Sequence, residues 1–200
     1  MTKNKWILLS ILAIAQSIIS ITIAWSGGFT EEAYRTSITF TMRCCTVFFC
    51  VIYMSRGLHV IFNSKATRFL LANRKVLGLF FSYAFVFHLC QLTFLHDQLH
   101  IDPLMLGVEM IPLAFINVMG ITSIPIVEKN MSRRLWKFIH RWGSVIIWIA
   151  LFKNYLLIYF VPSVLGDRSI FYVGSILVAI TPLVRFYLII RKRNRMLPSM

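Results

Sequence analysis

Long apolar stretches alternate with short polar segments along the whole of this 200-residue chain. The apolar stretches cover about residues 6–25, 38–54, 76–95, 104–127, 132–159 and 170–190. Each is close to the roughly 20 residues with which an α-helix crosses the ~30 Å hydrocarbon layer of a bilayer. The alternation typical of strands does not occur, and a spanning helix satisfies its own backbone. The pattern therefore predicts an all-α integral membrane bundle of six transmembrane helices, with residues 1–200 forming a single domain.

Three polar or interrupted segments add detail to this bundle. Residues 55–75 form the longest inner connection, where apolar residues alternate with basic ones, so we expect a short amphipathic helix on the cytoplasmic interface. In the fourth stretch, Pro112 and Pro125 are expected to kink the helix. His96 and His100 stand in an outer loop beside aspartates, where a solvated polar loop is a better interpretation than a surface metal site.

Composition excludes an ordinary soluble domain, because 58% of the residues are hydrophobic and only 14% are charged. The formal net charge of +14 does not indicate nucleic-acid binding, because most basic residues recur between apolar stretches on one side of the bundle. Those assigned to that side are Lys3, Lys5, Arg56, Lys65, Arg68, Arg74, Lys75, Lys129, Arg133, Arg134, Lys137, Arg141, Arg191, Lys192, Arg193 and Arg195. Every acidic residue except Glu128 is assigned to the opposite side. This positive-inside distribution predicts cytoplasmic N- and C-termini.

Ionisable side chains inside the apolar stretches are the candidates for function. Burying one in a bilayer costs roughly 2.5–3.5 kcal/mol, and His88, His140, Lys153 and Arg43 fall inside predicted spans. In membrane b-type cytochromes, neutral imidazoles from facing helices ligate haem iron from both sides. His88 in the third span and His140 in the fifth are therefore candidate metal ligands. Arg43 is interpreted either as a side chain that reaches the outer headgroups or as the partner of a buried anion.

Three segments carry a resemblance to a known family. Residues 35–43 read R-T-S-I-T-F-T-M-R, residues 74–89 read R-K-V-L-G-L-F-F-S-Y-A-F-V-F-H-L, and residues 134–142 read R-L-W-K-F-I-H-R-W. Over about residues 35–160 the chain thereby resembles the ferric reductase-like transmembrane domain family. The branch it resembles most is the haem-binding membrane subunit of bacterial methionine sulfoxide reductase systems (the MsrQ type).

This resemblance implies a haem-b subunit of an oxidoreductase in the bacterial inner membrane. Such a subunit would pass electrons from a cytoplasmic or quinone donor to an outer-side acceptor. The implied partners, besides membrane lipid, are a periplasmic reductase or a cytoplasmic flavin reductase. Arg74, Arg141 and Arg43 would contact haem propionates. The chain has no G-x-G-x-x-G motif and no flavin domain, so flavin and nicotinamide sites are expected on a separate protein.

The chain departs from the family pattern at Lys153, where the branch has a further histidine thirteen residues after the position of His140. Thirteen helical residues rise about 20 Å and rotate by about 220°, so these two positions differ in level and direction. Four arrangements stay open: Lys153 as a neutral ligand opposite His88, haem held by one histidine, another pairing such as His88 with His140, or a haem-free six-helix scaffold. A small transporter is disfavoured, because the sequence shows no inverted repeat or pair of broken helices.

Overall fold

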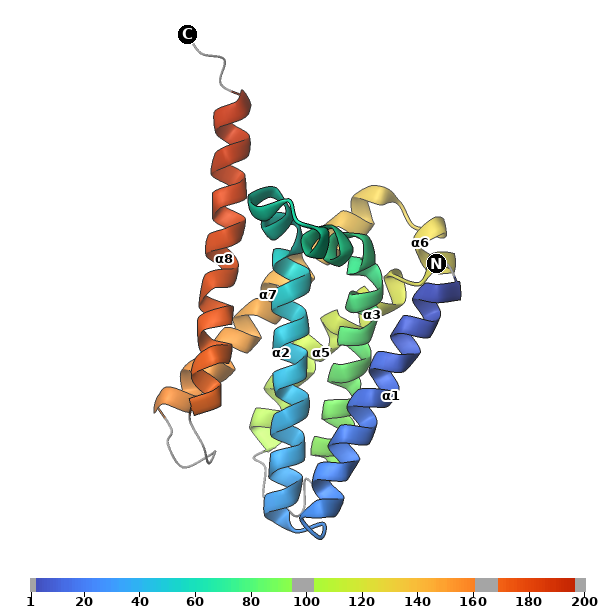
Figure 1. Cartoon of the computed structure of the whole chain (residues 1–200), viewed down its shortest axis with the longest axis vertical. Coiled ribbons are helices and arrows are strands. Elements are labelled where there is room, and N and C mark those ends of the chain that lie inside the picture. Colours follow the sequence, from blue (N-terminus) through green and yellow to red (C-terminus); the bar gives the residue numbers. More distant parts are fainter. Residues whose placement is uncertain (1–2, 95–102, 161–168, 197–200) are drawn as a thin grey trace.

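The computed structural model describes residues 3–94, 103–160 and 169–196. All regular secondary structure within these ranges is helical. The helices, shown in Figure 1, are α1 Lys3–Ser26, α2 Glu31–Phe62, α3 Lys65–Phe94, α5 Pro103–Thr122, α6 Pro125–Asn130, α7 Arg133–Phe160 and α8 Ser169–Met196. The predicted all-α class is confirmed for the described part of the chain.

Helices α2 and α3 lie side by side at the centre of the bundle, and the other long helices pack around them (Figure 1). Helix α1 contacts both of them, α8 contacts α2, and α5 contacts α3. Helix α7 packs against α5 and α8. The two helices that carry the candidate histidines therefore have different main neighbours: α3 packs against α1, α2 and α5, whereas α7 packs against α5 and α8.

Apolar side chains from five helices fill the middle of the bundle. Aromatic contacts connect α2 to α3, with ring centroids 4.4 Å apart for Phe48 and Phe80 and 5.6 Å apart for Phe49 and Phe81. The apolar side chains that are at most 2% exposed include Cys45, Cys50, Val76, Phe80, Ile116, Ile147 and Val178. Because this core excludes water, any polar group on the inner helix faces must find a partner inside the protein.

Four helices of the described chain are long and apolar enough to cross a bilayer: α1, α2, α3 and α7. Helices α5 and α8 contain shorter apolar stretches, residues 110–122 and 173–188. A large exposed apolar surface covers the outside of the bundle, including Ile11, Ile14 and Ile18 along one face of α1. The structure therefore supports the prediction of a helical membrane protein, with an exposed apolar surface suited to contact with lipid. Six spans and cytoplasmic termini stay predictions.

The connection between α2 and α3 differs from the predicted interfacial helix of residues 55–75. Both helices continue through this segment, and only Asn63 and Ser64 separate them. Asn63 ends α2 in the left-handed conformation (φ 41°, ψ 35°) and donates its N–H to the carbonyl of His59. The hydroxyl of Ser64 accepts the Thr67 N–H at 3.2 Å. The two extensions run across one end of the bundle (Figure 1).

The fourth predicted span, residues 104–127, is also divided differently. Helix α5 ends at Thr122, and the short helix α6 begins at Pro125 instead of continuing as a kinked span. Ile124 has an extended backbone (φ −66°, ψ 132°) because a residue before proline avoids the helical region. Pro112, in contrast, lies inside α5. The division leaves α6 free to lie at the end of the bundle beside α3 and α7.

Candidate functional site

His88 lies on the inner face of α3 and is almost completely buried, with 7% of its surface exposed. Its Nδ1 atom is 3.0 Å from the hydroxyl of Thr41 on α2, and its ring centroid is 6.2 Å from that of Phe85. The contact with Thr41 fixes which edge of the imidazole faces α2. The sequence identified His88 as a candidate, and the structure adds a hydroxyl that orients its ring.

Thr41 is one member of a buried hydrogen-bonded cluster that joins α1, α2 and α3. The Thr41 hydroxyl lies 3.0 Å from Gln91 Oε1. Gln91 Nε2 donates to the hydroxyls of Ser20 at 2.9 Å and Ser37 at 3.1 Å. Ser37 also donates to the Ser20 carbonyl at 2.9 Å, and the two serine hydroxyls are 2.7 Å apart. We call Ser20, Ser37, Thr41, His88 and Gln91 the α3 cluster.

The directions of these hydrogen bonds assign the proton of His88. The single hydroxyl proton of Thr41 faces two oxygen acceptors, the Ile38 carbonyl at 2.8 Å and Gln91 Oε1 at 3.0 Å. Neither oxygen can donate, so the proton goes to one of them and Thr41 accepts from His88 Nδ1–H. The assigned state is a neutral imidazole with its proton on Nδ1 and a lone pair on Nε2, the nitrogen farther from the backbone.

A buried amide stands at the same level as this imidazole. Gln16 on α1 is 4% exposed, and neither its Nε2 nor its Oε1 has a hydrogen-bond partner among the described residues. Helices α1 and α2 run in opposite directions, so one turn from the Ser20–Ser37 contact brings Gln16 to the level of Thr41. A buried amide without a protein partner is expected to bind water or another polar group.

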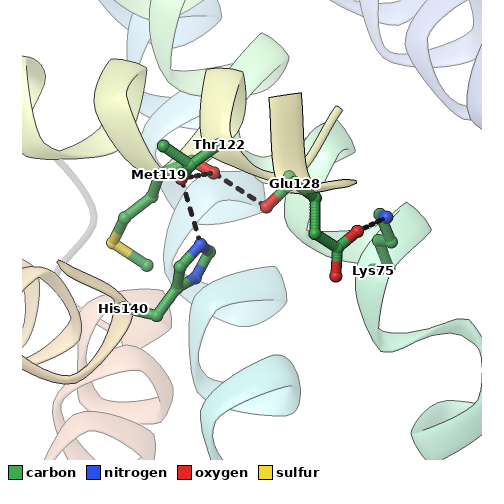
Figure 2. Close-up of polar contacts among 6 residues, drawn as sticks. Lys75, Met119, Thr122, Glu128 and His140 are labelled. Atoms are coloured by element: carbon green, nitrogen blue, oxygen red, sulfur yellow. Dashed lines mark hydrogen bonds and ion pairs between the residues drawn. The ribbon is translucent and has the colours of Figure 1, made fainter. Parts of the chain in front are cut away.

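His140 lies in a second cluster, formed by α5 and α7 (Figure 2). Its Nε2 atom is 3.2 Å from the hydroxyl of Thr122, and the Trp136 ring stacks on its imidazole with centroids 4.1 Å apart. One turn along α7, a Cβ on Gly143 would collide with the side chain of Met119 on α5. The two helices are therefore close at this level, where Thr122 on α5 meets His140 on α7.

The proton of His140 is assigned to the other ring nitrogen. The hydroxyl of Thr122 faces the carbonyls of Val118 at 2.7 Å and Met119 at 3.2 Å, which accept its proton. Thr122 therefore accepts a hydrogen bond from His140 Nε2–H. The remaining lone pair is on Nδ1, beside the Cβ atom, where a flat macrocycle would collide with the backbone. We call Trp136, His140 and Thr122 the α7 cluster.

An ion pair lies beside the α7 cluster and joins α6 to α3. The ammonium group of Lys75 contacts the carboxylate of Glu128, as Figure 2 shows. Glu128 and Arg74 both lie within electrostatic reach of His140. The sequence placed Glu128 apart from the other acidic residues, and this pairing gives the reason: the carboxylate offsets part of the positive charge at this end.

The other predicted site residues are distributed around the bundle. Arg43 is partly buried and lies within electrostatic reach of Tyr155 on α7. Arg74 and Lys153 are partly buried, and Arg141 is exposed on α7. The suggested His96–His100 metal site lies outside the described residues. Within the described residues, no three His, Cys, Asp or Glu side chains are grouped to hold a metal ion.

The structure thus holds His88 and His140 in separate clusters, each bonded to a threonine on a different helix. Sequence reasoning missed Thr41, Gln91 and Thr122, because serine, threonine and glutamine are ordinary residues of membrane helices. A weak signal existed in the helical spacing of Ser37 with Thr41 and of His88 with Gln91, which puts each pair on one helix face.

Comparison with models of known families, with curated proteins and with solved structures found no match to this chain. The ferric reductase-like resemblance of residues 35–160 therefore stays a prediction from the sequence.

Proposed function

We propose that this chain is a haem-b electron-transfer subunit in the bacterial inner membrane, and that His88 is its principal iron ligand. The observation that carries the proposal is the 3.0 Å contact between His88 Nδ1 and the Thr41 hydroxyl, in which we assign the proton to Nδ1. Histidines that bind metals usually donate the other ring N–H to a fixed acceptor, which sets the tautomer and the ring orientation. When bound, haem would supply reversible one-electron chemistry.

The donor set around His88 fits such a ligand. The imidazole is neutral and buried, and its lone pair is on Nε2, the nitrogen that a haem iron can approach without meeting the backbone. The unpartnered amide of Gln16 at the same level is consistent with a polar group or water beside this site. His140 fits less well in its present arrangement, because its Nε2–H is directed to Thr122. The proposal therefore favours haem held by one histidine over a clasp by His88 and His140.

The reductant and the acceptor belong to other proteins in this proposal. A cytoplasmic flavin reductase or the quinone pool would donate electrons, and a periplasmic reductase would accept them. Arg43, two residues after Thr41 on α2, is the best placed of the three predicted arginines for a propionate. Arg74 lies fourteen residues from His88 on α3, about 21 Å along the helix, and Arg141 is exposed. The proposal includes the predicted six-span topology with cytoplasmic termini.

A haem-free membrane scaffold or assembly partner is the second candidate, and a specific observation favours it. Phe80, Ile116 and Ile147 are at most 2% exposed in the middle of the bundle, so side chains already fill the space between α3, α5 and α7. Both histidines have threonine partners within the protein. In this alternative, the α3 cluster holds the helices together and has no redox role.

Absorption spectroscopy separates the two candidates. We expect the full chain, purified in detergent from haem-replete cells, to show a Soret band that sharpens and shifts when dithionite is added. His88→Ala should remove most of the bound haem, whereas His140→Ala should retain it. His59→Ala is the matched control, because His59 lies at the α2–α3 turn beside Thr67.

Two results would contradict the haem proposal. A colourless wild-type preparation under generous haem supply would favour the scaffold. Full retention of haem in a folded His88→Ala protein would exclude His88 as the principal ligand. Helical content by circular dichroism would establish that the variants are folded.

A further inference from the structure

Three arginines from three different helices gather at the end of the bundle where α2 ends and α3 begins. Arg56 and Arg185 flank a close approach of α2 and α8, where a Cβ on Gly57 would collide with the side chain of Val184. Arg56 directly precedes Gly57 in the sequence, and Arg185 directly follows Val184. The glycine therefore brings the two arginine positions close together.

The guanidinium of Arg185 has a defined position inside this junction. Its Cζ atom lies 4.0 Å from the centroid of the Tyr53 ring, in a cation–π contact. Tyr53 lies three residues before Arg56 on α2, so the two are on one helix face. Arg185 thus extends from α8 toward α2 instead of toward the surrounding lipid, and it is only partly exposed.

Arg74 adds a third positive charge from α3. It is partly buried and lies within electrostatic reach of both Arg185 and Arg56. Like charges gathered in this way repel one another, and partial burial reduces their screening by water. A negative group at this junction would offset the repulsion among the three charges.

The described chain offers little negative charge for this purpose. Its helices contain the acidic residues Glu31, Glu32, Glu109 and Glu128. Glu31 and Glu32 begin α2 at the opposite end, and Glu109 lies in the first part of α5, also toward that end (Figure 1). Glu128 is at the correct end, but its carboxylate pairs with Lys75.

We propose that Arg56, Arg74 and Arg185 form a binding site for a phosphate group, carried by an anionic lipid headgroup or present as free phosphate. Guanidinium groups present several N–H donors in a plane, which suits the oxygen atoms of phosphate. Basic pockets between membrane helices are typical sites for anionic headgroups. The cation–π contact leaves the planar edge of Arg185 available to donate.

The positive-inside distribution alone does not explain this arrangement. Topology requires only that basic residues lie on the cytoplasmic side, as the exposed Lys65 and Arg68 do on the first turns of α3. It does not require that side chains from three helices approach one another, or that two of them, Arg74 and Arg185, become partly buried. Arg68 therefore serves as a matched control for charge at the same end of the bundle.

The test measures ligand binding to the full chain in a neutral detergent, by native mass spectrometry and thermal unfolding. The probes are phosphatidylglycerol, phosphatidylcholine and inorganic phosphate against chloride at equal ionic strength. We expect phosphatidylglycerol or inorganic phosphate to bind and to raise the unfolding midpoint, and phosphatidylcholine to do so much less. An effect of the lipid alone identifies a headgroup site, whereas an effect of inorganic phosphate identifies a site for the free ion.

Substitutions locate the site. Arg185→Gln and Arg74→Gln should each weaken binding of the effective probe by about fivefold, the factor expected for one basic residue. Arg68→Gln should change binding by less than about twofold. Arg185→Lys should restore part of the affinity, because it keeps the charge but not the planar donor edge. If Arg185→Gln does not fold, Arg56→Gln replaces it, since Arg56 is exposed.

The inference is overturned if neither anionic probe binds better than phosphatidylcholine. It is also overturned if Arg68→Gln weakens binding as much as Arg74→Gln and Arg185→Gln do, which would indicate general surface charge. Binding is measured without a haem signal, so its outcome is independent of the proposed electron-transfer function.

Discussion

The α3 cluster and the α7 cluster place the same pair of side chains, a histidine and a threonine, in different surroundings. His88 is 7% exposed and bonded through Nδ1, and its threonine belongs to a network of three helices. His140 is partly exposed, bonded through Nε2, and stacked on Trp136 beside an ion pair. The comparison teaches that the partner of a histidine, more than its presence in a span, decides which nitrogen keeps a lone pair.

The two clusters also differ in what their polar groups do for stability. In the α3 cluster each hydroxyl and amide satisfies another buried group, so removing one leaves several without partners. In the α7 cluster the threonine hydroxyl contacts only one side chain, His140, besides carbonyls of its own helix, and the ion pair is partly exposed. The free energy of unfolding should therefore depend more strongly on the α3 cluster.

The largest loss of stability is expected from Gln91→Met, which removes the centre of the α3 cluster. The hydroxyls of Ser20, Ser37 and Thr41 lose their shared partner, and we expect the free energy of unfolding in detergent to fall by about 2–3 kcal/mol. Denaturant unfolding followed by circular dichroism measures this change. Thr93→Val is the control, since the Thr93 hydroxyl bonds only to the Leu89 carbonyl on its own helix. Equal effects of the two substitutions would refute the central role of Gln91.

Smaller losses of stability are expected from replacing Thr41 and Thr122, the threonines that contact His88 and His140. Thr41→Val should cost about 1–2 kcal/mol, because it leaves His88 Nδ1–H and Gln91 Oε1 buried without that partner. Thr122→Val should cost about 0.5 kcal/mol, because His140 can exchange its hydrogen bond for water. The same unfolding measurement applies to both. Equal losses would mean that the two clusters are energetically alike.

The smallest effect is expected from the ion pair between Lys75 and Glu128. Their side chains are 33% and 42% exposed, and exposed pairs contribute about 0–1 kcal/mol. Lys75→Met and Glu128→Gln, with the double variant, should give a coupling energy below about 1 kcal/mol in a double-mutant cycle. A coupling several times larger would show that α6 is held to α3 mainly by this pair.

The sequence predicted individual residues better than their partners. His88 and His140 were recognisable because ionisable residues are rare in apolar stretches. Thr41 and Thr122 were not, because hydroxyl residues commonly bond to their own helix, and only helix rotation decides which one faces a neighbour. The haem ligation suggested by the family resemblance stays a prediction, now concentrated on His88.

The predicted boundaries failed where local backbone chemistry decided the outcome. The interfacial helix expected over residues 55–75 became two helix extensions, because Asn63 can adopt a left-handed turn within two residues. The fourth span ended early because Ile124 precedes Pro125 and leaves the helical conformation. The hydrophobic pattern alone does not reveal the turn at Asn63 or the end of α5 before Pro125, since apolar residues continue on both sides of each position.

Apolar stretches of this length, with so few charges, leave a chain no alternative to helices in a bilayer, because each backbone N–H and C=O must be satisfied within its own segment. That much follows from the order of the residues. Packing of the helices decided the rest: which threonine meets each histidine, and which three arginines gather at one junction. These contacts depend on rotation and register, which are set by close approaches such as those at Gly57 and Gly143 and by the fit of the whole core.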